Sequence, residues 1–363
     1  CFVKSFKPLP LTNEHIDKCM ECGFCEVNCM SCGFTMSSRQ RIVVQREIAR
    51  LKATGEDDAR LKRLQKQYVY YGNVTCAADG LCSTSCPMKI NTGDLTHDLR
   101  NAAIKPNSFT HKVGDFCADN VPAIRSGIKL ALRSASLAQA VIGDKGVETV
   151  GKAIHAVGGP LWTPSLPKAY SAHEIEQTES KKKVVYFPSC LNQTMGKGHK
   201  GPQTNLVASE NGKYPVICDQ SPCMHRMQEH MTKVKPLELM EFIHDYVADS
   251  LEFHQIDEPI AIHLTCSTRL MKVENKMLNL ARRCSSNVVL PEGVGCCGFA
   301  GDKGFNNPEV NKYALRKLRA AIEKANVKRG FSNSRTCEIG LTTHSGVPYQ
   351  SLVYLINECT TVK

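Results

Sequence analysis

The sequence contains no apolar run that approaches the roughly eighteen residues of a membrane-spanning helix. The apolar residues between positions 141 and 154 are interrupted by Asp144, Lys145 and Glu148. No signal peptide precedes the cysteines, and the chain has no Gly-rich phosphate loop, no arguable Ser-His-Asp set and no recognisable flavin-binding segment. We therefore expect a protein that can lie on a membrane without crossing it.

Aromatic residues are scarce as well, at 6%, and the basic residues do not alternate with them. This pattern argues against a nucleic-acid-binding face, although 46 Lys and Arg against 35 Asp and Glu give a net charge of +11. Most basic residues are interleaved with acids. The excess fits an anionic lipid surface or an acidic partner, and it equally fits solvated surface charge. We expect no nucleic-acid partner and leave peripheral membrane contact open.

Cysteine is the residue that the chain has in excess. Its nineteen cysteines are odd in number and fall into tight local groups rather than an even scatter. A secreted disulfide framework normally has paired cysteines behind a signal peptide. The grouping therefore indicates metal ligation.

The first group has the spacing C-x2-C-x2-C-x3-C and consists of Cys19, Cys22, Cys25 and Cys29. Bacterial ferredoxins ligate cubane iron–sulfur clusters with this spacing. The two-residue gaps let a tight turn direct three thiolates at three irons of one cube. The fourth cysteine points away, toward a second cluster.

The second group supplies the complement, because Cys76, Cys82 and Cys86 repeat the spacing with Asp79 where the remaining cysteine would stand. A carboxylate is a hard ligand that holds iron weakly, so the second cluster is expected to have three irons, or four with one readily lost. Gly23 and Gly80 allow the backbone to approach the sulfur atoms closely.

Each cluster should take its last sulfur from the other group. Zinc knuckles are the alternative, but zinc needs two closed tetrads and these groups interlock. The expected ligands of cluster one are Cys19, Cys22, Cys25 and Cys86. Those of cluster two are Cys29, Cys76 and Cys82, with Asp79 or nothing on the fourth iron.

The insert between the two groups predicts two helices. Val44, Ile48 and Leu51 recur at i, i+4 and i+7, and Gly55 ends the run. A second apolar repeat follows over residues 61–68. These helices favour a helical ferredoxin over the small two-stranded kind. Residues 122–157 are also expected to be helical.

The C-terminal half resembles an internal repeat, with apolar runs that read as buried strands ending near a cysteine. The second copy is longer and contains Cys296-Cys297-Gly298, which the first lacks. In the first copy, residues 184–187 precede Cys190 and residues 216–217 precede Cys223. In the second copy, residues 260–263 precede Cys266 and residues 330–331 precede Cys337. We expect boundaries that give residues 1–100 to the ferredoxin, 101–180 to a helical linker, 181–255 to the first repeat and 256–363 to the second.

The paired cysteines form a second candidate metal site. Adjacent thiols cannot both bind one small ion without strain, but they can bridge a larger cluster. Together with Cys266 and Cys337, Cys296 and Cys297 could hold a further metal ion or iron–sulfur cluster. Packed thiols or a strained vicinal disulfide are the alternatives.

Five stretches resemble the C-terminal iron–sulfur half of the FAD-linked D-2-hydroxyacid dehydrogenases, the D-lactate and glycolate dehydrogenase group, and the iron–sulfur subunit of glycolate oxidase. The C-terminal repeats are similar to the cysteine-rich CCG domain, also found in heterodisulfide reductase B subunits. The stretches are residues 18–29, 38–51 (SRQRIVVQREIARL), 75–94 (TCAADGLCSTSCPMKINTGD), 293–304 (GVGCCGFAGDKG) and 332–354 (SNSRTCEIGLTTHSGVPYQSLVY).

The resemblance implies an α+β protein in which an α-helical ferredoxin domain precedes a duplicated α/β CCG domain. It also implies a partner flavin domain or subunit carrying FAD, which oxidises the 2-hydroxyacid. Electrons would then pass through two clusters to a membrane quinone or another respiratory acceptor. The implied location is peripheral, on the matrix side of a mitochondrial inner membrane or on a bacterial cytoplasmic membrane.

The sequence departs from that pattern in its repeats. The first repeat lacks the paired cysteine, and Ser334 stands where a C-x2-C ending would place another cysteine in the second. An accessory or structural subunit of a larger respiratory complex, or an interaction protein with inherited clusters, are therefore the competing interpretations.

Overall fold

The computed structural model describes residues 11–169, 184–195, 214–231 and 236–363. Contacts within the chain divide it into two units, Cys1–His111 and Lys112–Lys363, which are described separately. The helix α4 (Phe109–Asp119) spans the division. The predicted domain boundaries at residues 100, 180 and 255 remain predictions, and residues 170–180 of the expected linker lie outside the described residues.

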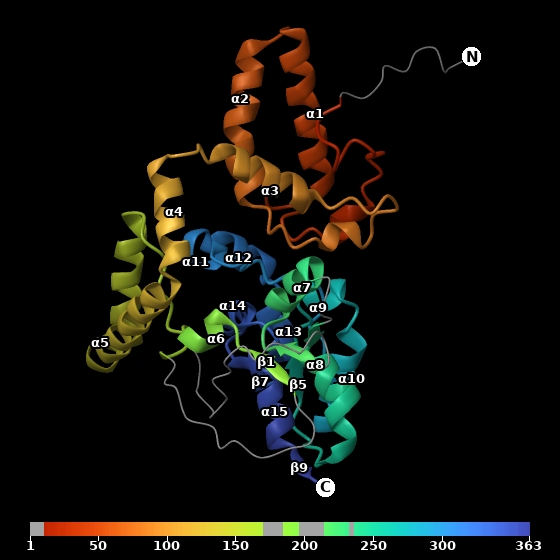
Figure 1. The fold of residues 1–363 in the computed structure, drawn as a ribbon, viewed down its shortest axis with the longest axis vertical. Helices are drawn as coiled ribbons and strands as arrows, with labels where there is room; N and C mark the ends of the chain where they lie inside the picture. Colours follow the sequence, from red (N-terminus) through yellow and green to blue (C-terminus); the bar gives the residue numbers. More distant parts are fainter. Residues whose placement is uncertain (1–10, 170–183, 196–213, 232–235) are drawn as a thin grey trace. The chain divides into compact units, whose positions relative to one another are not determined.

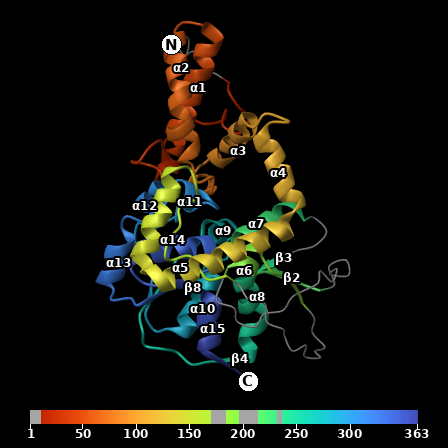
Figure 2. The ribbon, with the colours of Figure 1, turned by 90° about the vertical axis from the view of Figure 1, so that its left-hand side faces the viewer.

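The N-terminal unit is built on two long helices joined by a short loop, α1 (Ser38–Thr54) and α2 (Asp58–Tyr68), which lie side by side in Figures 1 and 2. Ser37 and Gln40 form a capping box at the start of α1. Gly55 ends it in the left-handed conformation, with φ of 66°. The two predicted helices of the insert are thus confirmed.

Shorter elements carry the cysteine groups around this helical pair. A small apolar core of Ile16, Ile42, Ile90 and Leu95 lies beneath them, with Cys19 and Cys86 packed against it. The shorter elements are the 3-10 helices η2 (Phe24–Asn28) and η4 (Leu81–Ser83), the π-helix η3 (Val69–Val74) and the helix α3 (Thr92–Ala103).

The C-terminal unit begins with the long helix α5 (Val121–Ala156), which confirms the helix predicted over residues 122–157. Gly143 interrupts its helical geometry with φ of 69° and ψ of 175°, so that α5 consists of two arms, as Figure 2 shows. Leu132 on the first arm and Val147 on the second are buried.

Two parallel sheets follow. In the order of neighbouring strands, the first is β1-β2-β3 and the second is β6-β5-β7-β8. The first contains β1 (Val185–Phe187), β2 (Val216–Cys218) and β3 (Pro236–Glu238). The second contains β5 (Ile260–Ile262), β6 (Val288–Val289), β7 (Arg329–Ser332) and β8 (Tyr349–Ser351).

Each strand except β6 leads directly into a helix, and the order is the same in both sheets. This shared order agrees with an internal repeat, whereas its identity as a duplicated cysteine-rich domain remains a prediction. In the first sheet the helices are α6 (Cys190–Thr194), α7 (Ser221–His230) and α8 (Leu239–Phe242). In the second they are α9 (Cys266–Leu270), α14 (Arg335–Ser345) and α15 (Leu352–Glu358).

The predicted strands at 184–187 and 260–263 are present, but they differ in burial. All three residues of β5 are buried, whereas those of β1 are only half-buried, so the expectation of a buried strand was wrong for β1. Within the described ranges, the first sheet has fewer strands than the second, and fewer helices cover it. Residues 196–213, which join β1 to β2, lie outside the described residues.

The second sheet carries the additional structure that the longer repeat predicts. Its helices pack on both cores of this unit, one around Phe331 and Met277 and one around Leu315 and Leu318. The added helices are α10 (Glu274–Cys284), α11 (Lys303–Asn306), α12 (Pro308–Ala314) and α13 (Leu318–Lys324). Two short helices, η5 (Ile243–Val247) and η6 (Ala248–Ser250), follow α8 and lead into the strand β4 (Leu251–Phe253). This strand pairs in antiparallel fashion with β9 (Thr360–Val362) near the end of the chain.

The first turns of α7 and α14 meet where the two sheets join. Ser221 N donates to Asn333 O at 3.2 Å. Arg335 N donates to Gln220 Oε1 at 2.8 Å, and Asn333 Nδ2 donates to Glu238 Oε1 at 3.1 Å. These buried contacts satisfy polar groups at the carboxyl ends of the strands and hold the two halves together. No helix in the described parts of the chain is both long and apolar enough to cross a membrane.

Candidate iron–sulfur sites

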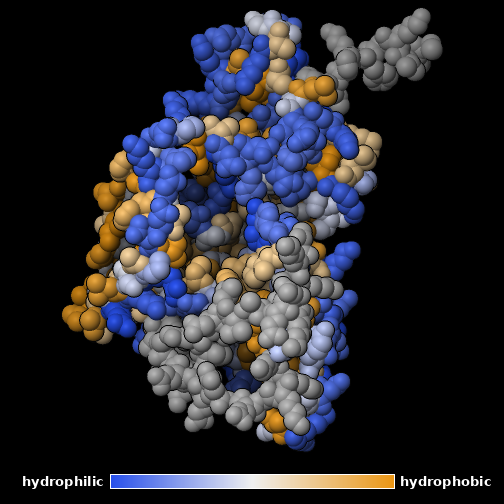
Figure 3. Space-filling model, viewed as in Figure 1, coloured by the Kyte–Doolittle hydropathy of each residue, from blue (hydrophilic) through white to orange (hydrophobic). Residues whose placement is uncertain are grey.

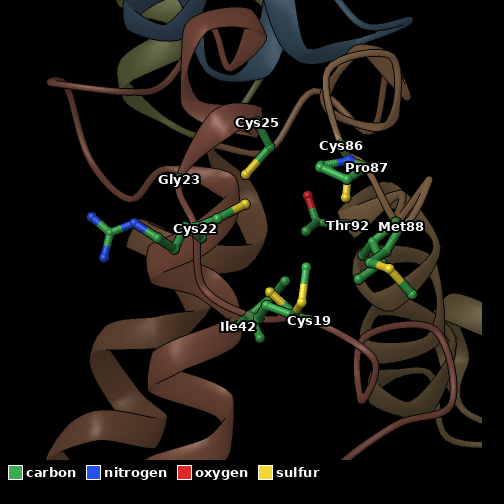
Figure 4. A pocket seen from close by; sticks show the side chains of 12 residues that line it. Cys19, Cys22, Gly23, Cys25, Ile42, Cys86, Pro87, Met88 and Thr92 are labelled. Carbon is green, nitrogen blue, oxygen red and sulfur yellow. The ribbon is translucent and has the colours of Figure 1, made fainter.

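The N-terminal unit contains a pocket that is lined by thiols from both cysteine groups. Its lining includes Cys19, Cys22 and Cys25 from the first group and Cys86 from the second. Figure 4 shows the sulfur atoms of these four side chains directed toward the same space. The structure therefore gathers the four residues that the spacing assigns to cluster one.

A second pocket has the reciprocal composition. Cys29 from the first group lies beside Cys76 and Cys82 from the second, with Asp79 in the lining. Thr92, the first residue of α3, lines both pockets, so that they adjoin. Residues of both cysteine groups therefore line each pocket, and the assignment of the individual ligands stays a prediction.

The two groups have matching backbones, which supports the alignment of Asp79 with Cys22. Glu21 and Ala78, each two residues after a cysteine, both have positive φ, of 58° and 49°. Their N–H groups donate to Cys19 Sγ and Cys76 Sγ respectively, each at 3.4 Å.

A glycine in the left-handed conformation then begins a 3-10 helix in each group. Gly23 has φ of 88° ahead of η2, and Gly80 has φ of 75° ahead of η4. Glycine adopts this conformation without the penalty that a Cβ would bring. The backbone can therefore wrap around each pocket and direct N–H groups at sulfur.

Two buried arginines of α1 hold the cysteine loops. Arg46 Nη1 bonds Glu21 Oε1 at 2.5 Å and its Nη2 donates to Cys19 O at 2.9 Å. Arg41 is 1% exposed, and its Nη1 donates to Cys29 Sγ at 3.5 Å. Arg41 Nε also donates to Gly72 O at 2.6 Å, which fixes the guanidinium in place.

The thiols of the two pockets differ in their surroundings. Burial raises the pKa of the Cys25 thiol to about 12, with the nearby Cys82 and Cys19 adding to the shift. Burial also acts to raise the pKa of Cys29, but the charge of Arg41 and hydrogen bonds from Ser31, Ser38 and Arg41 outweigh it, so that the pKa of Cys29 is lowered. The surroundings of Cys29 therefore stabilise its thiolate relative to that of an ordinary cysteine.

The donor chemistry fits iron–sulfur clusters. Cluster one would have four soft thiolates, and cluster two would have three thiolates and the hard carboxylate of Asp79. Among the described residues, no group of three or more His, Cys, Asp or Glu side chains is arranged to hold a single metal ion. Thiolates around a cubane each bind a different iron, so they need not meet at one point.

In the C-terminal unit, the third set of cysteines emerges at one edge of the second sheet. Cys266 begins α9 after β5, and Cys337 lies in the first turn of α14 after β7. Cys296 and Cys297 follow β6, which pairs with β5 as β7 does. The carboxyl ends of neighbouring parallel strands share an edge, so the fold brings these residues to the same side of the sheet.

Direct contact in this set is seen between Cys297 and Cys337, whose Sγ atoms lie 3.1 Å apart. A hydrogen bond with Cys296 lowers the pKa of Cys297, but the contact with Cys337 and burial outweigh it, so that the pKa is raised well above its usual value. Asn311 Nδ2 donates to Cys297 O at 2.7 Å, and His263 Nε2 lies 3.1 Å from Gly295 O. These contacts fix the loop that carries the paired cysteines.

Two regions of the chain match known protein families. Residues 15–90 match the 4Fe-4S dicluster domain. Residues 260–342 match the cysteine-rich domain. No curated protein matches the chain.

The chain therefore contains a ferredoxin-like iron–sulfur domain and a cysteine-rich domain, in a structure of mixed helices and strands. These domains indicate a redox role in electron transfer.

Sequence reasoning did not identify Arg41, Arg46 or Thr92 as parts of the site. A signal for Arg41 is present, because it lies three and seven residues before Val44 and Ile48 and so falls on the same helix face. A cation on an apolar face that is followed by buried residues indicates a buried charge with a specific partner.

Proposed function

We propose that this chain is the iron–sulfur electron-transfer component of a flavin-dependent D-2-hydroxyacid dehydrogenase, with D-lactate or glycolate as the substrate of the partner flavoprotein. The observation that supports electron transfer most strongly is that residues of both cysteine groups line each of the two pockets. Each has thiols from both cysteine groups, which is what two interlocked clusters need. The five stretches that resemble the dehydrogenase group support the choice of partner.

The ligands follow from the linings. Cys19, Cys22, Cys25 and Cys86 would hold cluster one, and Cys29, Cys76, Cys82 and Asp79 would hold cluster two. When bound, each cluster accepts and releases one electron at a time. The protein residues set the conditions for this. Arg41 places a positive charge beside the thiol of Cys29, backbone N–H groups bond sulfur, and Thr92 lies between the two pockets.

Electrons would enter from FAD on a separate domain or chain and leave to a membrane quinone or another respiratory acceptor. The location that follows from this role is peripheral, on the matrix side of a mitochondrial inner membrane or on a bacterial cytoplasmic membrane. A further metal site at Cys266, Cys296, Cys297 and Cys337 is part of the proposal, supported by the shared sheet edge.

The test is anaerobic reconstitution of the chain with iron and sulfide, followed by addition of a D-lactate or glycolate flavoprotein. We expect substrate to reduce the clusters, measured by electron paramagnetic resonance and by bleaching of the visible absorption. Clusters that dithionite reduces but hydroxyacid does not would contradict the choice of partner. Clusters inert to dithionite would contradict electron transfer itself. Purification with a large respiratory complex lacking hydroxyacid activity would instead support the accessory-subunit interpretation.

A further inference from the structure

The first arm of α5 presents an apolar outer face. Leu130, Leu137 and Val141 lie at i, i+7 and i+11, which places them on one stripe of the helix. Their exposures are 66%, 71% and 83%. Leu132, on the opposite side, is 8% exposed and packs into the core around Leu315. The stripe therefore faces away from the protein by virtue of how the helix is anchored.

In Figure 3, α5 lies at the left edge of the view, as in Figure 1. Apolar residues colour the side of the molecule that α5 forms, interspersed with hydrophilic ones. On the second arm, beyond the bend at Gly143, Val150 and Ile154 are also exposed, at 50% and 48%. Single exposed apolar residues are normal on protein surfaces, whereas several exposed apolar residues aligned on one side of a helix indicate a contact surface.

Charge along the first arm has one sign. Residues 121–142 contain Arg125, Lys129 and Arg133 and no Asp or Glu. Arg125 lies on the side of the buried Leu132 and donates to Gln193 Oε1 at 2.5 Å, so it faces α6. Lys129 and Arg133, which follow it at four-residue steps, lie between that side and the apolar stripe. Burial and the charges of Arg125 and Arg133 lower the pKa of Lys129. An approaching anionic surface would relieve this repulsion.

We infer that the first arm of α5 lies on an anionic lipid surface, with Leu130, Leu137 and Val141 in the headgroup region and with Lys129 and Arg133 against lipid phosphates. A helix with an apolar stripe beside basic side chains is suited to the membrane interface. The absence of acidic residues over 22 positions distinguishes this arm from an ordinary solvated helix, in which both signs occur. A partner protein with an acidic, apolar face and a second copy of the chain are the other occupants that the experiment distinguishes.

This inference rests on the proposed function. It names the surface through which the chain would reach an electron acceptor dissolved in lipid. Vesicle binding and cluster reduction are separate measurements, so the failure of one leaves the other standing. Loss of vesicle binding with intact hydroxyacid-dependent reduction would refute only the lipid surface.

The experiment is cosedimentation of the full reconstituted chain with phosphatidylcholine vesicles, with and without about one-third phosphatidylserine. We expect binding that requires phosphatidylserine and weakens with salt. The triple variant Leu130→Ser, Leu137→Ser and Val141→Ser should reduce the partition coefficient by at least about tenfold, because three exposed apolar side chains no longer enter the interface. The variant Arg133→Gln should reduce it about fivefold. The matched control is Val362→Ser, which removes an apolar residue of 83% exposure elsewhere in the same unit.

Visible absorption of the clusters and unchanged thermal unfolding show that each variant is folded. Absence of binding to either vesicle, or equal binding by the triple variant and the control, would overturn the inference. Binding that does not depend on phosphatidylserine would overturn its electrostatic part. A dimer in solution that the triple variant abolishes, without vesicle binding by the parent, would assign the stripe to a second copy. Saturable binding to the flavoprotein that the triple variant loses, again without vesicle binding, would assign it to that partner.

Discussion

The guanidinium of Arg41 lies against the thiol of Cys29, with Nη1 3.5 Å from Sγ, inside a unit where Arg41 is 1% exposed. Its Nη2 also donates to Ser31 Oγ at 2.8 Å, and Ser31 Oγ lies 3.4 Å from Cys29 Sγ. A buried cation with fixed partners interacts more strongly with a nearby charge than a solvated one does. Cluster two would therefore be held beside a permanent positive charge.

Removal of this charge should lower the reduction potential of cluster two. Reduction adds negative charge, and Arg41 stabilises it, so Arg41→Gln should shift the midpoint downward by about 60 mV, equivalent to a tenfold change in the one-electron equilibrium. Arg41→Lys keeps the charge and should shift it less. A potentiometric titration followed by electron paramagnetic resonance measures both. Equal midpoints in the parent and Arg41→Gln would show that the arginine has only a structural role.

Asp79 should determine the iron content of cluster two. A carboxylate holds iron weakly, so the parent protein should show a three-iron signal in the oxidised state, or gain one on mild oxidation. Asp79→Cys supplies the missing thiolate and should abolish that signal while raising iron per chain by about one. Asp58→Cys, at an exposed position in α2, is the control for an added thiol. A three-iron signal that persists in Asp79→Cys would contradict the assignment.

The paired cysteines should hold metal beyond that of the N-terminal unit. Cys337→Ser removes the thiol that contacts Cys297, so it should lower the iron per chain without changing the signals of clusters one and two. Iron and zinc analysis of anaerobic protein provides the measurement. Unchanged metal content, together with a Cys296–Cys297 disulfide by mass spectrometry, would favour the disulfide interpretation instead.

Glu238 should make stability depend on pH. It is 1% exposed, and burial raises the pKa of its carboxyl to about 7 despite hydrogen bonds from Met240 N, Glu241 N and Asn333. Its pKa in the unfolded chain is near 4.5. The folded state therefore binds more protons between these values, and the free energy of unfolding should fall as pH rises from about 5 to 7.5.

The measurement for Glu238 is denaturant unfolding of the parent and Glu238→Gln across that pH range. The variant carries no titrating group at this position, so its free energy of unfolding should fall less steeply with pH. Over the range, the fall should be smaller than that of the parent by up to about 3 kcal/mol. Glu252→Gln, in the exposed middle of β4, is the control and should leave the slope unchanged. Parallel slopes for the parent and Glu238→Gln would contradict the predicted protonation of Glu238.

Local sequence signals predicted much of the fold. Gly55 and the apolar repeat ending at Leu51 predicted the end of α1, and the runs before Cys190 and Cys266 predicted β1 and β5. Such features depend on neighbouring residues, so they are readable without the fold. The pairing of β4 with β9 was not predicted, because it joins residues more than a hundred positions apart through backbone hydrogen bonds that leave no local pattern.

The candidate sites were likewise predicted from the sequence only in part. The cysteine spacing predicted which thiols lie together, because tight turns fix their directions within each group. The place of Arg41 on the apolar face of α1 indicates a buried cation, but the spacing could not predict that Cys29 is its partner, because that contact depends on how the helix packs against the cysteine loops. The bend of α5 at Gly143 was likewise unpredicted, because glycine permits but does not require positive φ.

The most direct test of the crossed arrangement is to remove the last cysteine of each group and record which cluster is lost. Cys86→Ala lies in the second group but should abolish the signal of cluster one and leave the oxidised-state signal of the Asp79 site. Cys29→Ala lies in the first group but should abolish the Asp79-site signal and spare cluster one. If Cys86→Ala instead eliminated the Asp79-site signal and preserved the other cluster, the two cysteine groups would each close their own site, and the account would be wrong.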